Sequence, residues 1–188
     1  MTAAPTGHTL RVTVLVGNPR PGSRTFTTAV RAAEALVERV RPELGEAVSS
    51  VTVSAVDLAS LGGDLLAAEP TAGVAGALAA TQGADLLLVG SPAYKGTFTG
   101  VLKVFLDRLP HLALGGVLAI PVLVAGAPHH LTSLESGLGP VLTEVGASLP
   151  VEAFTVLEGD LVALDQVLDP WVRRVAPGVV EALRARLA

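Results

Sequence analysis

The chain has 188 residues, of which 50% are hydrophobic and 16% charged, and its formal net charge is -4 at pH 7. This length suits one domain, and neither the weak negative charge nor the 3% aromatic content favours a nucleic-acid-binding surface. Because the chain has no cysteine, it contains no disulfide, thiolate nucleophile or cysteine-ligated metal, and we expect a cytoplasmic protein.

The amino-terminal part of the sequence predicts a strand, a loop and a long helix. Residues 1–9 are expected to be flexible, and they lack the basic start and continuous apolar run of a signal peptide. An apolar run predicts a buried strand at 9–18, and apolar positions at helical spacing predict a helix over 23–41. Pro42 and Gly45 are expected to end that helix.

The middle of the chain continues the same alternation. Residues 48–58 alternate as a strand does, and residues 72–83 form a small-residue helix after a glycine-rich loop. Residues 84–92 are the clearest buried strand, and the helix predicted at 98–109 stops before Pro110.

The last third predicts strand, helix, strand and helix at residues 116–127, 131–146, 147–159 and 170–188. Pro177 and Gly178 are expected to kink or break the last helix. The most apolar stretch lies in the first of these strands and is shorter than the ~20 residues that a membrane-spanning helix needs. The mean hydropathy of +0.58 therefore indicates elements buried on both faces.

Five strands alternating with five helices predict an α/β fold, specifically a flavodoxin-like three-layer sandwich. Its parallel sheet would have the order 2-1-3-4-5 with helices on both faces, all in one domain over residues 1–188. In this fold, ligands bind beyond the carboxyl ends of the first and third strands. The two most unusual loops of the sequence follow these strands.

The first loop, "GNPRPGSRT" at residues 17–25, favours binding of a phosphate group. It leads into a helix amino terminus, and it supplies the hydroxyls of Ser23 and Thr25 and the charges of Arg20 and Arg24. A triphosphate-binding P-loop does not fit, because the lysine that it requires is absent and no predicted strand ends in an aspartate suited to hold Mg²⁺. Taken singly, each of these residues is also explained as part of an ordinary turn before a capped helix.

The second loop, "GSPAYKGTFTG" at residues 90–100, offers an apolar edge for a flat aromatic ligand. Ala93 and the chain's single tyrosine, Tyr94, form that edge, and Lys95 is one of only two lysines. The simpler explanation is a surface loop capped by Thr97 or Thr99 before the next helix.

The third loop, after the fourth strand, contains Gly126, Ala127, His129 and His130. Adjacent histidines do not share a helix face, and no acidic or cysteine partner follows at ligand spacing, so a metal site is not expected. A serine hydrolase is not expected either, because no G-x-S-x-G elbow is present. Phosphate donors and an apolar edge without catalytic side chains favour chemistry performed by a cofactor, such as hydride transfer.

The sequences of the first and second loops resemble motifs of the NADPH-dependent FMN reductase family. "GNPRPGSRT" is similar to that family's G-S-x-R-x-x-S-x-T loop, with Asn18 in place of the commoner serine, and residues 90–110 resemble its second motif. The similarity covers residues ~10–160. The segment "AGAPHHLTSLESGLGPVL" resembles the branch that supplies reduced flavin to two-component monooxygenases.

The resemblance implies FMN and NADPH or NADH as cofactors, and a homodimer or homotetramer whose 97–110 helix helps to build the interface. It implies that the FMN phosphate is held by Asn18, Arg20, Ser23, Arg24 and Thr25. It implies that the flavin ring is contacted by Pro92, Ala93, Tyr94, Lys95, Gly96, Gly126 and Ala127.

The leading hypothesis is an NAD(P)H:FMN oxidoreductase in which hydride passes to flavin N5 and reduced FMN leaves for a partner monooxygenase. The helix after the fourth strand lacks the tyrosine that some flavin-releasing relatives insert, and Ser136 lies about where it would fall. Two alternatives therefore stay open. One is a reductase of quinones, azo dyes or metal oxyanions that keeps its FMN bound, and the other is a flavodoxin-like electron carrier.

Overall fold

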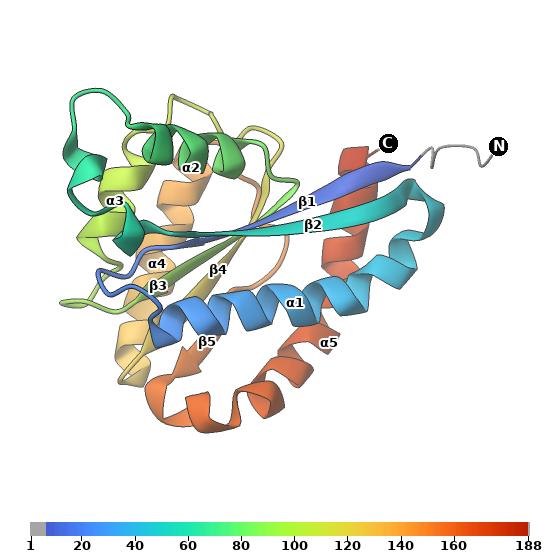
Figure 1. Ribbon diagram of the computed structural model, residues 1–188. Coiled ribbons are helices and arrows are strands. Elements are labelled where there is room, and N and C mark those ends of the chain that lie inside the picture. Colours follow the sequence, from blue (N-terminus) through green and yellow to red (C-terminus); the bar gives the residue numbers. More distant parts are fainter. Residues whose placement is uncertain (1–6, 188) are drawn as a thin grey trace.

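The computed structural model describes residues 7–187, which form a parallel sheet in the order β2-β1-β3-β4-β5 (Figure 1). The strands are β1 (His8–Val16), β2 (Val48–Asp57), β3 (Leu86–Pro92), β4 (Leu118–Ala125) and β5 (Phe154–Leu157). β3 and β4 are buried along their whole length, as expected of strands covered on both faces. The predicted flavodoxin-like order is confirmed.

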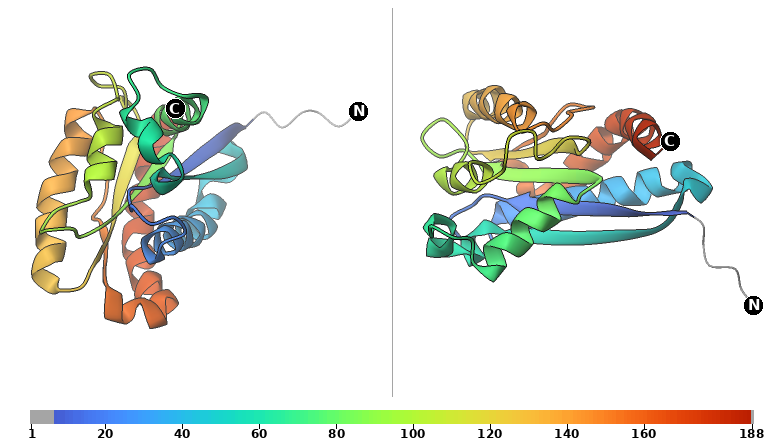
Figure 2. Two further views of the ribbon diagram at one scale, coloured as in Figure 1. Left: turned by 60° about the vertical axis from the view of Figure 1, so that its left-hand side comes forward. Right: turned by 90° about the horizontal axis from the view of Figure 1, so that it is seen from above.

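Helices cover both faces of the sheet (Figures 1 and 2). The helices are α1 (Arg24–Leu44), α2 (Ala72–Gln82), α3 (Gly100–Leu106), α4 (Pro128–Glu144) and α5 (Leu164–Leu187). α1 and α5 pack together on one face, and α2, α3 and α4 bury their apolar side chains against the other. Among the described residues, none of these helices combines the length and apolarity needed to cross a membrane.

The two longest helices, α1 and α5, continue through prolines at which the sequence predicts an end or a break. The predicted end of α1 at Pro42 is wrong, because the helix runs to Leu44, which is buried, and Gly45 ends it with a φ of 57°. α5 is likewise unbroken at Pro177 and Gly178. Buried side chains on both sides of this pair hold the helix to the core: Val175, Ala176, Val179 and Val180.

The two ends of the sheet differ from the prediction. β5 is confined to Phe154–Leu157, because Ser148 makes only an isolated bridge to β4 and Pro150, which follows it, cannot donate to a strand ladder. At the amino terminus, residues 1–6 of the segment expected to be flexible lie outside the described residues. His8 and Thr9 already belong to β1 and pair with β2, so the boundary at residue 9 is wrong.

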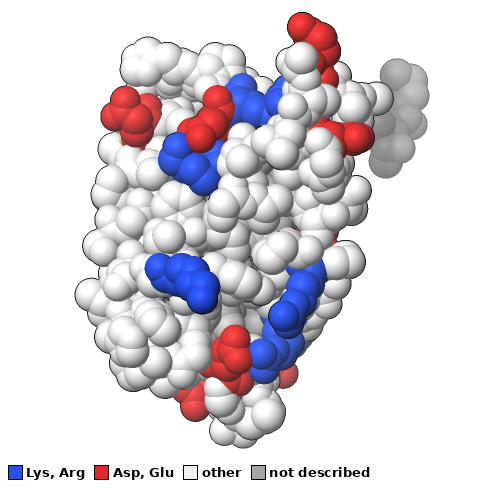
Figure 3. Space-filling view, turned by 90° about the vertical axis from the view of Figure 1, so that its left-hand side faces the viewer, with Lys and Arg blue, Asp and Glu red and all other residues white. Residues whose placement is uncertain are grey.

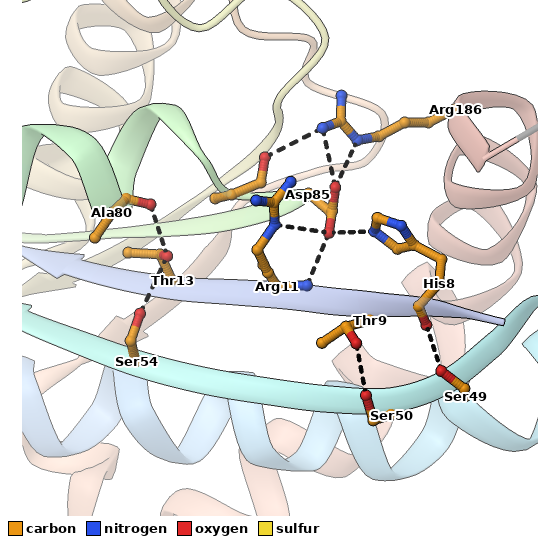
Figure 4. Close-up of polar contacts among 11 residues, drawn as sticks. His8, Thr9, Arg11, Thr13, Ser49, Ser50, Ser54, Ala80, Asp85 and Arg186 are labelled. Atoms are coloured by element: carbon orange, nitrogen blue, oxygen red, sulfur yellow. Dashed lines mark hydrogen bonds and ion pairs between the residues drawn. The ribbon is translucent and has the colours of Figure 1, made fainter. Parts of the chain in front are cut away.

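A buried carboxylate, Asp85, joins the amino ends of β1 and β3 to the end of α5 (Figure 4). Its Oδ2 accepts the Arg11 backbone N–H and lies 2.8 Å from His8 Nε2, and its Oδ1 accepts two hydrogen bonds from Arg186. Burial alone would raise the pKa of Asp85. The hydrogen bonds from Arg11, His8 and Arg186 outweigh it, so the pKa lies below the ordinary value of 3.8.

We expect Asp85→Asn to lower the free energy of unfolding by about 2–3 kcal/mol at neutral pH, because three hydrogen-bonding groups lose their charged partner. A carboxyl whose pKa is lowered by folding stabilises the protein above its unfolded pKa and loses that contribution as the pH falls through its folded pKa. The difference between wild type and variant should therefore be constant above pH ~5 and shrink below pH ~4.

Urea denaturation over a series of pH values measures this difference. The exposed Asp160 supplies a control, since Asp160→Asn should change the unfolding free energy little at any pH. A wild-type advantage over Asp85→Asn that persisted undiminished in acid would show that the carboxylate is not the stabilising species.

Candidate functional site

A cavity of about 500 Å³ opens where the carboxyl ends of β1, β3 and β4 meet the amino terminus of α1. Figure 3 looks onto this edge of the sheet and shows basic and acidic groups interspersed over a mostly uncharged surface. The first and second loops supply most of the wall. The lining residues are Asn18, Arg20, Pro21, Ser23, Arg24, Thr25, Pro92, Ala93, Tyr94, Val124 and Glu158.

The first loop is shaped from within by two buried polar side chains, Asn18 and Thr25. Asn18 Oδ1 accepts the Arg20 backbone N–H at 2.9 Å, and its Nδ2 donates to Thr25 Oγ1 at 3.3 Å. These contacts curl residues 18–25 into a compact turn. Asn18 and Thr25 therefore line the cavity with polar atoms that already have partners within the protein.

The amino terminus of α1 points its free donors at this cavity. Ser23 caps the helix, since its Oγ accepts the Phe26 N–H at 3.2 Å. The backbone N–H groups of Arg24 and Thr25, in the first turn, have no acceptor among residues 7–187. Together with the positive end of the helix dipole and the exposed Arg20 and Arg24 side chains, they favour an anion here.

The second loop forms a two-residue hairpin turn that presents Tyr94. Tyr94 and Thr97 exchange both backbone hydrogen bonds, and the two residues at the tip, Lys95 and Gly96, have φ values of 53° and 82°. Lysine rarely adopts such a conformation. Tyr94 is 39% exposed and lies on the cavity wall with Pro92 and Ala93, whereas Lys95 and Gly96 lie at the tip of the turn, outside the lining.

A set of close contacts locks the first two loops together. Thr99 caps α3, as the sequence allows, and its Oγ1 also donates to the Gly17 carbonyl at 2.6 Å. The Gly17 N–H donates to the Gly90 carbonyl at 2.8 Å. Gly17 sits so close to Leu102 that a Cβ at this position would lie 2.3 Å from the Leu102 Cβ. These contacts therefore hold the first loop at a fixed distance from the apolar edge of the second loop.

The end of β4, just before the third loop, contributes Val124 to the wall, a residue that no sequence motif marks. Gly126 and Ala127 follow two and three positions later and are not among the residues that line the cavity. The rings of His129 and His130 lie 4.1 Å apart in the first turn of α4. Within the described part of the chain, no group of three or more potential metal ligands comes together.

Two acidic residues that sequence reasoning missed contact the first loop. Asp57 ends β2, and its Oδ2 accepts the Gly22 N–H at 2.9 Å. Glu158, directly after β5, pairs with Arg24 at 2.7 Å across 134 residues of sequence. Asp57 could have been found as the last position of an alternating strand beside β1. No local signal marks Glu158.

The chemistry of the lining fits an elongated ligand with an anionic phosphate at one end and a flat apolar ring at the other. The phosphate end has two guanidinium groups and unpaired first-turn amides, and the ring end has Pro92, Ala93, Tyr94 and Val124. The wall carries no histidine and no pair of carboxylates. Its donors and apolar side chains therefore suit FMN, a cofactor that itself carries electrons.

Comparisons with known proteins agree with this geometry. The model of the NADPH-dependent FMN reductase family matches residues 10–160. The NADH-dependent FMN reductase SfnF of Pseudomonas putida is 32% identical over 154 residues, which cover 79% of this chain and 78% of that protein. The FMN reductase (NADPH) of Escherichia coli is 36% identical over 88 residues, and this match spans 47% of this chain and 43% of that protein.

Solved structures extend the likeness. An NADH:FMN oxidoreductase called EMOB, in its apo form, superposes with a TM-score of 0.71 at 29% identity, covering 88% of this chain and 90% of that one. Flavodoxin 1 from Bacillus cereus superposes with a TM-score of 0.56 at 14% identity, covering 90% of this chain and 96% of that one, and shows the shared fold alone.

Proposed function

Because the chain belongs to the NADPH-dependent FMN reductase family, we propose that it is an oxidoreductase that transfers a hydride from NADPH or NADH to FMN. One observation carries this proposal. The free amides of the α1 amino terminus and the guanidinium groups of Arg20 and Arg24 face the same cavity as the apolar wall of Pro92, Ala93 and Tyr94. FMN, when bound, supplies the hydride acceptor.

Each group of residues has a separate task in this proposal. Arg20, Arg24 and the first-turn amides hold the phosphate, while Asn18, Ser23 and Thr25 keep the loop and helix terminus in the shape that binds it. The apolar wall holds the ring edge and excludes water from one of its sides. Lys95 and Gly96, at the tip of the second loop, and Gly126 and Ala127, which follow β4, contact the flavin ring from outside this lining. No side chain of the protein takes up or releases a proton in the hydride step.

We further propose that residues 1–188 form a single flavin-binding domain that works in the cytoplasm as a homodimer or homotetramer and delivers reduced FMN to a partner monooxygenase. The similarity of residues 125–142 to the flavin-supplying branch of the family supports such a partner. If the protein remained yellow through dialysis, FMN would be a bound group, and the acceptor would be a quinone, an azo dye or a metal oxyanion.

A titration with FMN, FAD and riboflavin tests the phosphate assignment. FMN should bind about tenfold or more tightly than riboflavin, because hydrogen bonds to a charged phosphate contribute more than those to a neutral hydroxyl. Fluorescence quenching of the free flavin measures all three affinities. Equal affinities for FMN and riboflavin would contradict the proposal.

Anaerobic mixing with NADPH and NADH tests the reaction itself. When the protein with FMN is mixed with either nucleotide, the absorbance of oxidised flavin should fall. The preferred nucleotide should give the faster fall in absorbance. A protein that binds FMN and shows no bleaching with either nucleotide would be an electron carrier.

A further inference from the structure

Glu158 places a carboxylate in the wall of a cavity whose other polar groups favour an anion. Its Oε2 accepts a hydrogen bond from Arg24 Nη2 at 2.7 Å, and both residues belong to the wall of the cavity. The Glu158 side chain is 44% exposed and that of Arg24 66% exposed, so neither is held in place by burial. A negative charge thus stands at the end of the cavity that favours an anion.

The other acid at the first loop, Asp57, differs from Glu158 in what it binds. Asp57 accepts backbone N–H groups of Gly22 and Ala59, and these contacts shape the backbone. Glu158 instead engages one of the two guanidinium groups available to a phosphate. The Arg20 guanidinium makes no hydrogen bond or ion pair with the residues that the structure describes, so Arg20 is the cation that remains free.

We propose that Glu158 competes with the FMN phosphate for Arg24 and so sets a weak affinity for FMN, which makes the flavin a substrate that exchanges at each turnover. This inference rests on the proposed function and concerns the same site. The phosphate monoester carries about -1.5 to -2 charges at pH 7 and is repelled by a carboxylate that shares its guanidinium partner. On binding, Arg24 turns from Glu158 to the phosphate, and Glu158 is left to solvent.

The expected change in FMN affinity depends on how exposed the Glu158–Arg24 ion pair is to solvent. Water and salt screen half-exposed charges, so the ion pair itself is weak and yields to a dianion. Removing the Glu158 charge should therefore tighten FMN binding about three- to tenfold at low ionic strength, and less at high salt. Riboflavin has no phosphate, and its affinity should stay unchanged.

The experiment compares Glu158→Gln with Glu152→Gln as a matched control. Glu152 is also a half-exposed glutamate paired with an arginine, Arg174 of α5, but it precedes β5 and lies outside the candidate site. Both variants change the net charge by the same amount. The dissociation constants of FMN and riboflavin are measured for each protein by fluorescence quenching at low and high salt, and the release rate of FMN is measured by stopped flow.

The inference is supported if Glu158→Gln lowers the dissociation constant and slows the release of FMN, while riboflavin binding and the Glu152→Gln protein are unaffected. An unchanged or weaker FMN affinity in Glu158→Gln overturns it, as does an equal gain for riboflavin. Failure of the proposed function looks different, because the wild-type protein would then show no preference for FMN over riboflavin.

A double-mutant comparison adds a second readout. Arg24→Ala should weaken FMN binding more in the Glu158→Gln background than in the wild-type background, because only in the former is Arg24 free of its competitor. Equal losses in the two backgrounds would show that Glu158 and the phosphate do not share Arg24.

Discussion

Replacing Arg20 by alanine is expected to raise the dissociation constant of FMN about ten- to hundredfold and to leave that of riboflavin unchanged. A hydrogen bond to a charged group contributes about 1.5–3 kcal/mol, and each ~1.4 kcal/mol is a factor of ten in affinity. The Arg20 side chain is exposed, and only its backbone N–H takes part in the loop, through Asn18 Oδ1. The substitution should therefore remove the charge without unfolding the turn.

Fluorescence titration with both flavins measures this effect, and Arg41→Ala is the matched control. Arg41 lies in the last turn of the same helix whose first turn faces the cavity, so its loss changes the net charge equally and should leave FMN binding intact. Wild-type affinity for FMN in Arg20→Ala would remove Arg20 from the phosphate site. Ser23→Ala is a less clean probe, because Ser23 caps α1 and its loss costs about 0.5–2 kcal/mol of stability.

Replacing Gly17 by alanine is expected to lower the free energy of unfolding by about 3 kcal/mol, the upper end of the range for overpacked sites. The new Cβ would lie 2.3 Å from the Leu102 Cβ, an overlap that a side-chain rotation cannot relieve. α3 must then move away from the first loop, which breaks the hydrogen bond between Thr99 Oγ1 and the Gly17 carbonyl. We expect FMN binding to weaken for the same reason.

Thermal and urea unfolding measure the loss, with Gly76→Ala as the control. Gly76 is an exposed position in α2, and no atom beyond its chain neighbours and the adjacent backbone of its own helix lies within 4 Å of the point that an alanine Cβ would occupy there. Alanine at this position should therefore raise the stability of the helix by about 0.5–1 kcal/mol. A Gly17→Ala protein as stable as wild type would mean that α3 and the first loop are not rigidly packed against each other.

The sheet order and the position of the site could be predicted from the sequence, because short apolar runs such as residues 84–92 alternate with helical patterns. The first loop begins at Gly17, directly after β1, and the second follows β3 from Ala93 onward, and the structure brings both to one cavity. The expectation that proline ends or breaks a helix failed where tertiary packing stabilises the helix on both sides of the proline. Pro42 and Pro177 lie inside helices whose neighbouring side chains are buried.

The electrostatics of the site could not be predicted in the same way. Glu158 reaches Arg24 only because β5 and the turn after it are placed by the whole sheet, and nothing within a few residues of Glu158 marks that contact. The left-handed conformation of Lys95 could not be predicted from the sequence either, because Lys-Gly is an uncommon residue pair in two-residue hairpin turns.

The ion cluster around Asp85 has a practical consequence for how the protein can be handled. It draws His8 and Arg11, near the first described residue, and Arg186, near the last, onto one carboxylate, at the edge of the sheet opposite the three loops (Figures 1 and 4). A fluorescent reporter, an electrode tether or an oxygenase attached beside His8 or Arg186 would therefore lie away from the candidate site. Because His8 and Arg186 contact the same carboxylate, the described part of the chain is also a good candidate for circular permutation.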